Sequence, residues 1–168
     1  GDKRVDFSEV QEKWNCSREE WNDWQWQLDN SISSVEELQD KFAISKQEAN
    51  EIKQAADVFP MSITPYYASL IDFDNDTCPI KQQAVPQKKE LQNTNYEMDD
   101  PLHEDEDSPV DGLTHRYPDR VLLLVTNKCS MFCRHCTRKR KVGDGESGVD
   151  LEQIKEGIEY IRQTPQVR

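Results

Sequence analysis

The stretch that decides the fold is RVLLLVTNKCSMFCRHC, residues 120–136. It opens with an uninterrupted apolar run at residues 121–125, which is too short for a typical helix and shows no polar alternation. Such a run predicts a strand buried on both faces, as in a parallel sheet. Directly after it, Cys129, Cys133 and Cys136 follow the spacing C-x3-C-x2-C. The stretch therefore predicts a buried strand that ends in a metal-binding loop.

A helix is predicted downstream of the cysteines. Asp150 and Gln153 form a capping-box pattern. Apolar residues then recur at helical spacing, namely Leu151, Ile154, Ile158 and Ile161. Strand, loop and helix in this order predict the first unit of a β/α repeat, and therefore an α/β fold.

Upstream of the strand, the sequence predicts a helical region over residues 1–71. Serines followed by a glutamate at the third position mark helix starts at Ser17, Ser34 and Ser45, and Thr64-Pro65 marks another. One helix after Ser17 is expected to carry a tryptophan-rich stripe that forms core or a subunit interface, with Trp21, Trp24 and Leu28 on one face.

Three segments are expected along the chain. Residues 1–71 form the helical region, residues 72–114 an irregular acidic connection, and residues 115–168 the start of a β/α core domain. The irregular character is expected to extend to residue 119, and most of its acidic side chains are interpreted as a solvated loop. A structureless stretch of this length tends to be functional or wrapped over a partner.

The composition narrows the classes of partner. Thirty-three acidic residues against 21 basic ones give a net charge of −12, which disfavours nucleic acid and anionic membrane as partners. The sequence has no apolar run long enough to span a bilayer and no signal-peptide pattern at its start, which predicts a cytoplasmic protein. The mean hydropathy of −0.94 is low for a compact domain.

The cysteines point to a metal rather than to disulfides. Their number is odd, five, and three of them are clustered. The isolated Cys16 and Cys78 are expected to be small buried side chains. Thiolates suit zinc or an iron–sulfur cluster, and three cysteines would leave one iron of a four-iron cluster open to a small-molecule chelator. The alternatives are a structural zinc site, for which His135 and His115 are the nearby histidines, and a non-catalytic iron–sulfur cluster, which would need a fourth cysteine.

The residues around the cysteines resemble the lysine 2,3-aminomutase family of the radical S-adenosylmethionine superfamily. The resemblance is carried by CSMFCRHCTRKR (129–140), HRYPDR (115–120), DPLHED (100–105), ITPYY (63–67) and WNDW (21–24). It implies a partial (β/α) barrel of radical S-adenosylmethionine type behind a helical N-terminal region, truncated in this chain, and a homo-oligomer. Glutamate 2,3-aminomutase is a related alternative.

The resemblance also implies an activity and its cofactors. The family interconverts L-lysine and L-β-lysine, using a 4Fe-4S cluster, S-adenosyl-L-methionine and pyridoxal 5′-phosphate, with flavodoxin or ferredoxin as electron donor. The lysine that carries the pyridoxal phosphate and the residues that select the substrate are expected beyond Arg168. The chain alone is therefore expected to be inactive and to leave the choice of substrate undecided.

Individual roles follow from the matched motifs. Cys129, Cys133 and Cys136 would ligate the cluster, and His135 would lie against S-adenosylmethionine, unless it is an ordinary loop histidine. Arg138 matches the position that pairs with the substrate carboxylate, for which a planar guanidinium is well suited.

The resemblance assigns two further arginines to the pyridoxal phosphate. Arg116 and Arg120 are the candidates, because the motif that contains them lies near this cofactor in the family. The alternative is that they form buried salt bridges with Asp119 or with the acidic segment.

Overall fold

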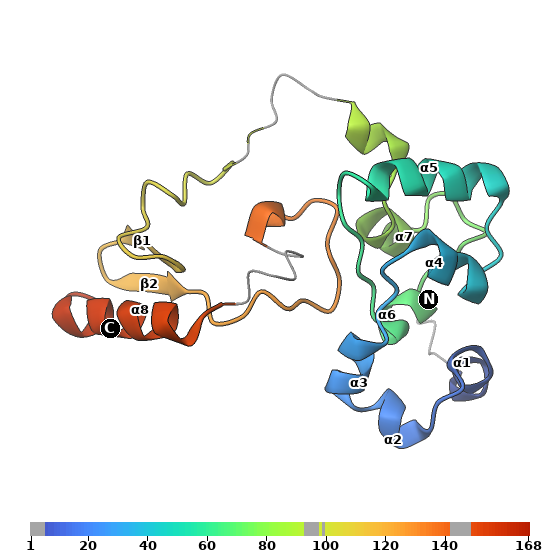
Figure 1. The fold of residues 1–168 in the computed structure, drawn as a ribbon, viewed down its shortest axis with the longest axis horizontal. Helices are drawn as coiled ribbons and strands as arrows, with labels where there is room; N and C mark the ends of the chain where they lie inside the picture. The colour runs from blue at the N-terminus through green and yellow to red at the C-terminus, as the bar shows by residue number, and fades with distance from the viewer. Residues whose placement is uncertain (1–5, 93–97, 99, 142–148) are drawn as a thin grey trace. The chain divides into compact units, whose positions relative to one another are not determined.

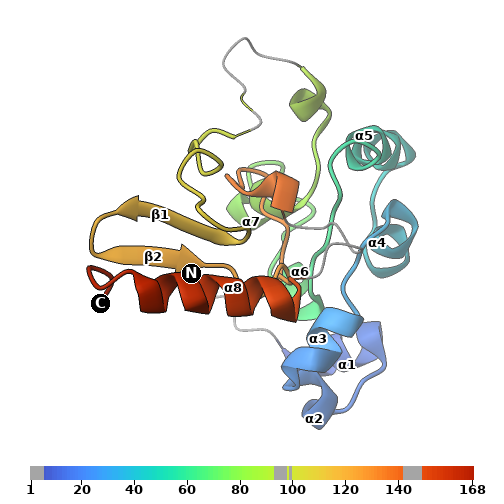
Figure 2. The ribbon, with the colours of Figure 1, turned by 60° about the vertical axis from the view of Figure 1, so that its left-hand side comes forward.

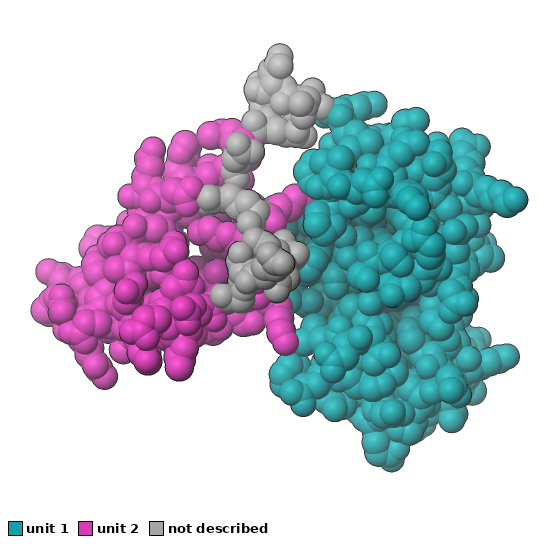
Figure 3. Space-filling view, in the orientation of Figure 1, with its two compact units in different colours: residues 1–94, 129–136 teal, residues 95–128, 137–168 magenta. Residues whose placement is uncertain are grey.

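The computed structural model describes residues 6–92, 98, 100–141 and 149–168. The chain forms two compact units, each described by itself below (Figure 3). Unit 1 contains Gly1–Thr94 and Cys129–Cys136, and unit 2 contains Asn95–Lys128 and Thr137–Arg168. The cysteine segment therefore belongs with the helical region. The predicted domain boundaries after residues 71 and 114 stay a prediction.

Unit 1 is helical (Figure 1). Its elements are α1 (Phe7–Trp14), α2 (Arg18–Trp21), α3 (Trp24–Asp29), α4 (Val35–Lys41), α5 (Lys46–Ala56), α6 (Pro65–Ser69), α7 (Pro79–Ala84) and the 3-10 helix η1 (Lys88–Leu91).

The helix starts of unit 1 confirm the capping predictions. The hydroxyls of Ser17, Ser34 and Ser45 each accept a hydrogen bond from the backbone N–H three residues later, at 3.1–3.2 Å. Each bond satisfies a donor that the first turn of a helix leaves without an intrahelical partner. Pro65 occupies the first turn of α6, as predicted.

The tryptophan-rich segment is divided into α2 and α3, not the single predicted helix. Asp23 causes the division, because its carboxylate accepts the backbone N–H of Gln25 at 2.9 Å and starts a second helix. Trp24 is 68% exposed, which contradicts a place in a core of this chain, and the predicted alternative of a subunit interface stays a prediction. Trp21 does pack, with its ring centroid 5.8 Å from that of Trp14 and 6.2 Å from that of Tyr66.

The core of unit 1 lies around Leu38 of α4 and Ile63, both fully buried. Ile63 forms an antiparallel bridge with Ile32 and another with Met131, so a short extended segment sits between two others. Further buried members of this core are Val35, Ala49, Ile52, Met61, Ala68, Ile71, Ala84 and Val85. The core thus joins the helices to the chain around Met131.

Unit 2 consists of the strands β1 (Leu113–Tyr117) and β2 (Arg120–Leu123), the 3-10 helix η2 (Lys139–Lys141) and the helix α8 (Leu151–Gln163). The strands are antiparallel, with Leu113 opposite Leu123 and an irregularity between Thr114 and Tyr117. α8 lies along β2 (Figures 1 and 2). Its predicted start is confirmed, because Asp150 and Gln153 form the capping box.

Two predictions about the strand region need correction. β2 pairs antiparallel, not parallel, and the predicted strand is not buried on both faces, since Leu122 of β2 is 43% exposed and Val125, beyond the end of β2, is 58% exposed. The strand is half-exposed because α8 covers one face of the hairpin. The pairing is antiparallel because β1, the neighbouring segment of the chain, is the partner of β2. The strands in the described ranges form a single two-stranded sheet, so the fold is α/β but the predicted partial barrel is not confirmed.

Residues 72–119 are also more regular than predicted. They contain α7, η1 and β1. α7 and η1 were missed because they are short, and β1 because Thr114, His115 and Arg116 give it a polar sequence. In the described part of the chain, no helix combines the length and apolar character that crossing a membrane requires.

The packing of α8 on β2 makes a testable prediction at Gly157. A Cβ atom there would lie 2.5 Å from Leu123 Cδ1 and 3.5 Å from Leu113 Cδ1. We expect Gly157→Val to lower the free energy of unfolding by about 1–3 kcal/mol, the usual cost of overpacking, although valine is the better helix former. Urea denaturation followed by circular dichroism measures this loss. The control is Glu156→Val at the exposed neighbouring position, and equal stability of Gly157→Val and the wild type would contradict the packing.

Candidate functional site

The cysteine loop, residues 129–136, is attached to unit 1 through its backbone. The N–H of Thr64 donates to the carbonyl of Ser130 at 3.1 Å, and the N–H of Phe132 donates to the carbonyl of Ser62 at 2.9 Å. These two bonds form the bridge between Ile63 and Met131. The first half of the loop is therefore held as a short extended segment against the helical core.

The second half of the loop is attached through a side chain. The guanidinium of Arg134 donates from Nε and Nη2 to the carboxylate of Glu90 at 2.8–3.2 Å. It also donates from Nη1 to the carbonyl of Pro60 at 2.9 Å and from Nη2 to that of Phe59 at 3.3 Å. The backbone N–H of Arg134 donates to the carbonyl of Gln83 at 2.8 Å. Sequence reasoning assigned no role to Arg134 or Glu90.

The three thiols of the loop differ in exposure, and Cys129 lies near enough to Cys133 and Cys136 for their charges to act on it. Cys129 is exposed, while Cys133 and Cys136 are half-buried, and Cys133 packs against the core of unit 1. The pKa of the Cys129 thiol is raised, first by partial desolvation and then by the nearby Cys136 and Cys133. None of the five cysteines forms a disulfide, and Cys16 and Cys78 are buried, which confirms the expected burial of that pair.

The donor set of the loop fits a thiolate-bound metal group. Cysteine thiols on one short, anchored loop, outside any disulfide, are soft ligands of the kind that iron–sulfur clusters and zinc take. In the described ranges, no group of three or more histidine, cysteine, aspartate or glutamate side chains is already arranged to hold a metal ion. The assignment of Cys129, Cys133 and Cys136 as ligands therefore stays a prediction.

The two histidines considered for a zinc site lie in different units. His135 is an exposed residue of the cysteine loop. His115 belongs to β1 of unit 2, where its Nδ1 lies 2.6 Å from the hydroxyl of Tyr160. The role of His135 against S-adenosylmethionine stays a prediction.

Arg138, in unit 2, already has a carboxylate partner. Its Nη2 donates to Oε1 of Glu104 at 2.5 Å, and Lys141 Nζ lies 3.7 Å from the other oxygen. The Glu104 side chain is only 6% exposed, whereas that of Arg138 is 31% exposed. Glu104 is therefore no part of a solvated loop. The sequence did not predict this role of Glu104 because Arg138 and Lys141, its partners, lie more than thirty residues away in the chain.

The two arginines predicted to bind a phosphate are also paired with carboxylates. Arg116 Nε lies 2.7 Å from Asp107, and Arg116 also donates to the carbonyl of Leu102. Arg120 binds its neighbour Asp119 at 2.9 and 3.1 Å. These are the partners that the alternative interpretation named, but the pairs are not buried. A phosphate would have to compete with them, and the assignment stays a prediction.

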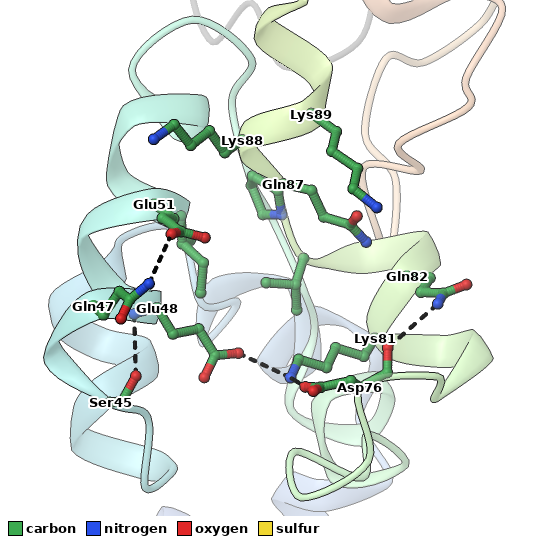
Figure 4. Close-up of a pocket in the computed structure, with 13 residues that line it drawn as sticks. Ser45, Gln47, Glu48, Glu51, Asp76, Lys81, Gln82, Gln87, Lys88 and Lys89 are labelled. Carbon is green, nitrogen blue, oxygen red and sulfur yellow. Dashed lines mark hydrogen bonds and ion pairs between the residues drawn. The ribbon is translucent and has the colours of Figure 1, made fainter.

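Unit 1 also contains a hollow of about 460 Å³ between α5 and the segment from Asp76 to Lys89 (Figure 4). The amine of Lys81 projects into it and lies 2.8 Å from Glu48 and 3.6 Å from Asp76. None of its lining residues comes from the cysteine loop. Lys81 therefore joins α5 to α7, and the hollow is separate from the candidate site.

Comparison with known proteins gives relatives but no matching family model. The chain is 55% identical over 154 residues to the L-lysine 2,3-aminomutase of Acetoanaerobium sticklandii, covering 92% of this chain and 37% of the relative. It is 51% identical over 150 residues to that of Bacillus subtilis, covering 89% of this chain and 32% of the relative. The glutamate 2,3-aminomutase of Clostridioides difficile is 39% identical over 154 residues, or 92% of this chain and 36% of the relative.

The chain thus spans about a third of the length of these curated relatives. Within that span the similarity extends over both units, because the match with the Acetoanaerobium protein includes 92% of the chain. With 51–55% identity to several L-lysine 2,3-aminomutases over about nine-tenths of its own length, the chain belongs to the lysine 2,3-aminomutase family.

Proposed function

We propose that this chain is part of an enzyme that interconverts L-lysine and L-β-lysine by radical chemistry. The observation that carries the proposal is the identity of 51–55% to proteins named L-lysine 2,3-aminomutase, against 39% to one named glutamate 2,3-aminomutase. The three cysteines of the anchored loop, none of which forms a disulfide, support it.

Cys129, Cys133 and Cys136 are the residues that would hold a 4Fe-4S cluster. When bound, the cluster supplies the electron that cleaves S-adenosyl-L-methionine. The protein's part is to carry the three thiols on one short loop. The loop residues between them are fixed to the core of unit 1 by the backbone bonds of Ser130 and Phe132. His135, exposed on the same loop, is the proposed contact of the S-adenosylmethionine adenine.

Arg138 is the proposed partner of the substrate carboxylate. Its guanidinium is held by Glu104, a buried carboxylate, which limits the orientations of the planar fork. Nearly a third of the Arg138 side chain stays exposed, on which a second carboxylate could pack. Glu104 would thus orient Arg138 and also neutralise part of its charge. A substrate carboxylate must add to this pair or replace it.

The remaining cofactor and partners are proposals from the resemblance. Arg116 and Arg120 are the proposed contacts of the pyridoxal 5′-phosphate, whose phosphate would have to compete with Asp107 and Asp119 for the two guanidiniums. We further propose a cytoplasmic homo-oligomer that receives electrons from flavodoxin or ferredoxin.

Glutamate is the competing substrate within the family. The lower identity to the glutamate enzyme disfavours it. Turnover of L-lysine and L-glutamate in one mixture by the enzyme that carries this chain, followed by chromatography of the β-amino acids, decides between them. Preferential formation of β-glutamate would refute the proposed lysine specificity.

The ligand assignment predicts the behaviour of Cys133→Ser. After anaerobic reconstitution with iron and sulfide, the wild type should contain about four irons per chain and give an electron paramagnetic signal that changes when S-adenosylmethionine is added. The variant should lose both properties, because a ligand is missing. Cys16→Ala, which removes a buried thiol of the same unit, is the control and should keep them. A colourless wild type with one bound zinc would favour the structural zinc site instead.

The carboxylate assignment predicts the kinetics of Arg138→Lys in the enzyme that carries this chain. A lysine keeps the charge but cannot form the bidentate pair. We expect kcat/KM for lysine to fall about ten-fold or more, as for a lost charged hydrogen bond of about 1.5–3 kcal/mol. Arg162→Lys, the same substitution on the exposed face of α8, should leave the kinetics unchanged. Equal kinetics in both variants would remove Arg138 from the substrate site.

A further inference from the structure

We infer that Arg134 and Glu90 act as positioning residues for the candidate cluster site, by fixing the cysteine loop before the metal group binds. This inference rests on the proposed function. We call the pair the Arg134–Glu90 clamp.

The clamp is largely shielded from solvent, and its atoms make several hydrogen bonds. The side chain of Arg134 is 7% exposed and that of Glu90 18%. Two guanidinium nitrogens contact the Glu90 carboxylate, and the remaining contacts go to the carbonyls of Phe59 and Pro60. A side chain with so many directed bonds has one permitted orientation. The clamp therefore defines the path of the backbone at Arg134.

Glu90 is itself fixed from behind. It lies on η1, and its Oε1 accepts the backbone N–H of Gln87 at 2.9 Å. η1 therefore fixes the Glu90 carboxylate, and this carboxylate fixes the guanidinium of Arg134, which belongs to the cysteine loop. Arg134 stands directly after Cys133 and two residues before Cys136.

The clamp and the backbone bonds bracket Cys133. Ser130 and Phe132 are held on one side of it and Arg134 on the other. The half-buried Cys133 is thus fixed by both of its neighbours, whereas Cys129 and Cys136 lie outside the bracket. Without the clamp, the loop would become ordered only when the cluster binds. The entropic cost of that ordering would then oppose cluster binding and weaken it.

A purely stabilising role fits this geometry less well. A buried ion pair contributes little net stability, because desolvation of the two charges offsets their attraction. What the pair does provide is a defined geometry. Residues that orient metal ligands from outside the ligand set typically change metal affinity about 10–100-fold when substituted.

The test uses Arg134→Lys, which keeps the charge but loses the fork, and the double variant Arg134→Met/Glu90→Gln, which leaves no charge of this pair buried and uncompensated. In the metal-free protein, we expect alkylation of Cys133 and amide hydrogen exchange over residues 129–136 to become about ten-fold faster or more. In the reconstituted protein, we expect loss of the cluster to an iron chelator to be about 10–100-fold faster.

The control is Glu36→Gln, which breaks the exposed Lys53–Glu36 pair of the same unit and should change none of these rates. Circular dichroism is used to check that each variant is folded. If folded Arg134→Lys and the double variant retain the cluster as well as the wild type does, the positioning role of the clamp is refuted, even if the loop exchanges faster. The proposed function is not affected by that result. Unchanged alkylation and exchange also refute the positioning role. A wild type that takes up no iron overturns the proposed function, and the role of the clamp with it.

Discussion

The structure depends on the attachment of the cysteine loop to the helices of unit 1. Residues 62–64 pair with residues 130–132, and Arg134 reaches carbonyls more than seventy residues earlier in the chain. These contacts place a loop that follows β2 in sequence against the core around Ile63. Because that core also joins α4, α5 and α6, the position of the thiols is set by the helical region.

The same long-range character governs the charges of unit 2. The chain carries a large acidic excess, yet the arginines considered as anion binders each contact a carboxylate: Arg138 with Glu104, Arg116 with Asp107 and Arg120 with Asp119. Part of the acidic character thus serves to orient guanidinium groups. The binding free energy of a negatively charged ligand is then only the difference between the energy of its own contacts and that of the contacts it replaces.

Local signals were predictable because they involve residues close in sequence. The caps at Ser17, Ser34 and Ser45 need only a hydroxyl and the N–H three residues on, and the structure has each one. The apolar run before the cysteines did predict a strand, but its partner and burial depend on elements far away. With β1 beside it and α8 on one face, the strand is antiparallel and half-exposed.

From the sequence alone one could predict the helix starts at Ser17, Ser34, Ser45, Thr64 and Asp150, the spacing of Cys129, Cys133 and Cys136, and the family to which these motifs point. Only the tertiary structure decided that the cysteine loop packs with the helical region, that Glu104 is buried against Arg138, and that Glu90 holds Arg134. The reason is that these partners are 34 and 44 residues apart in the chain. No local pattern specifies such a pairing, since it forms only once the core brings the segments together.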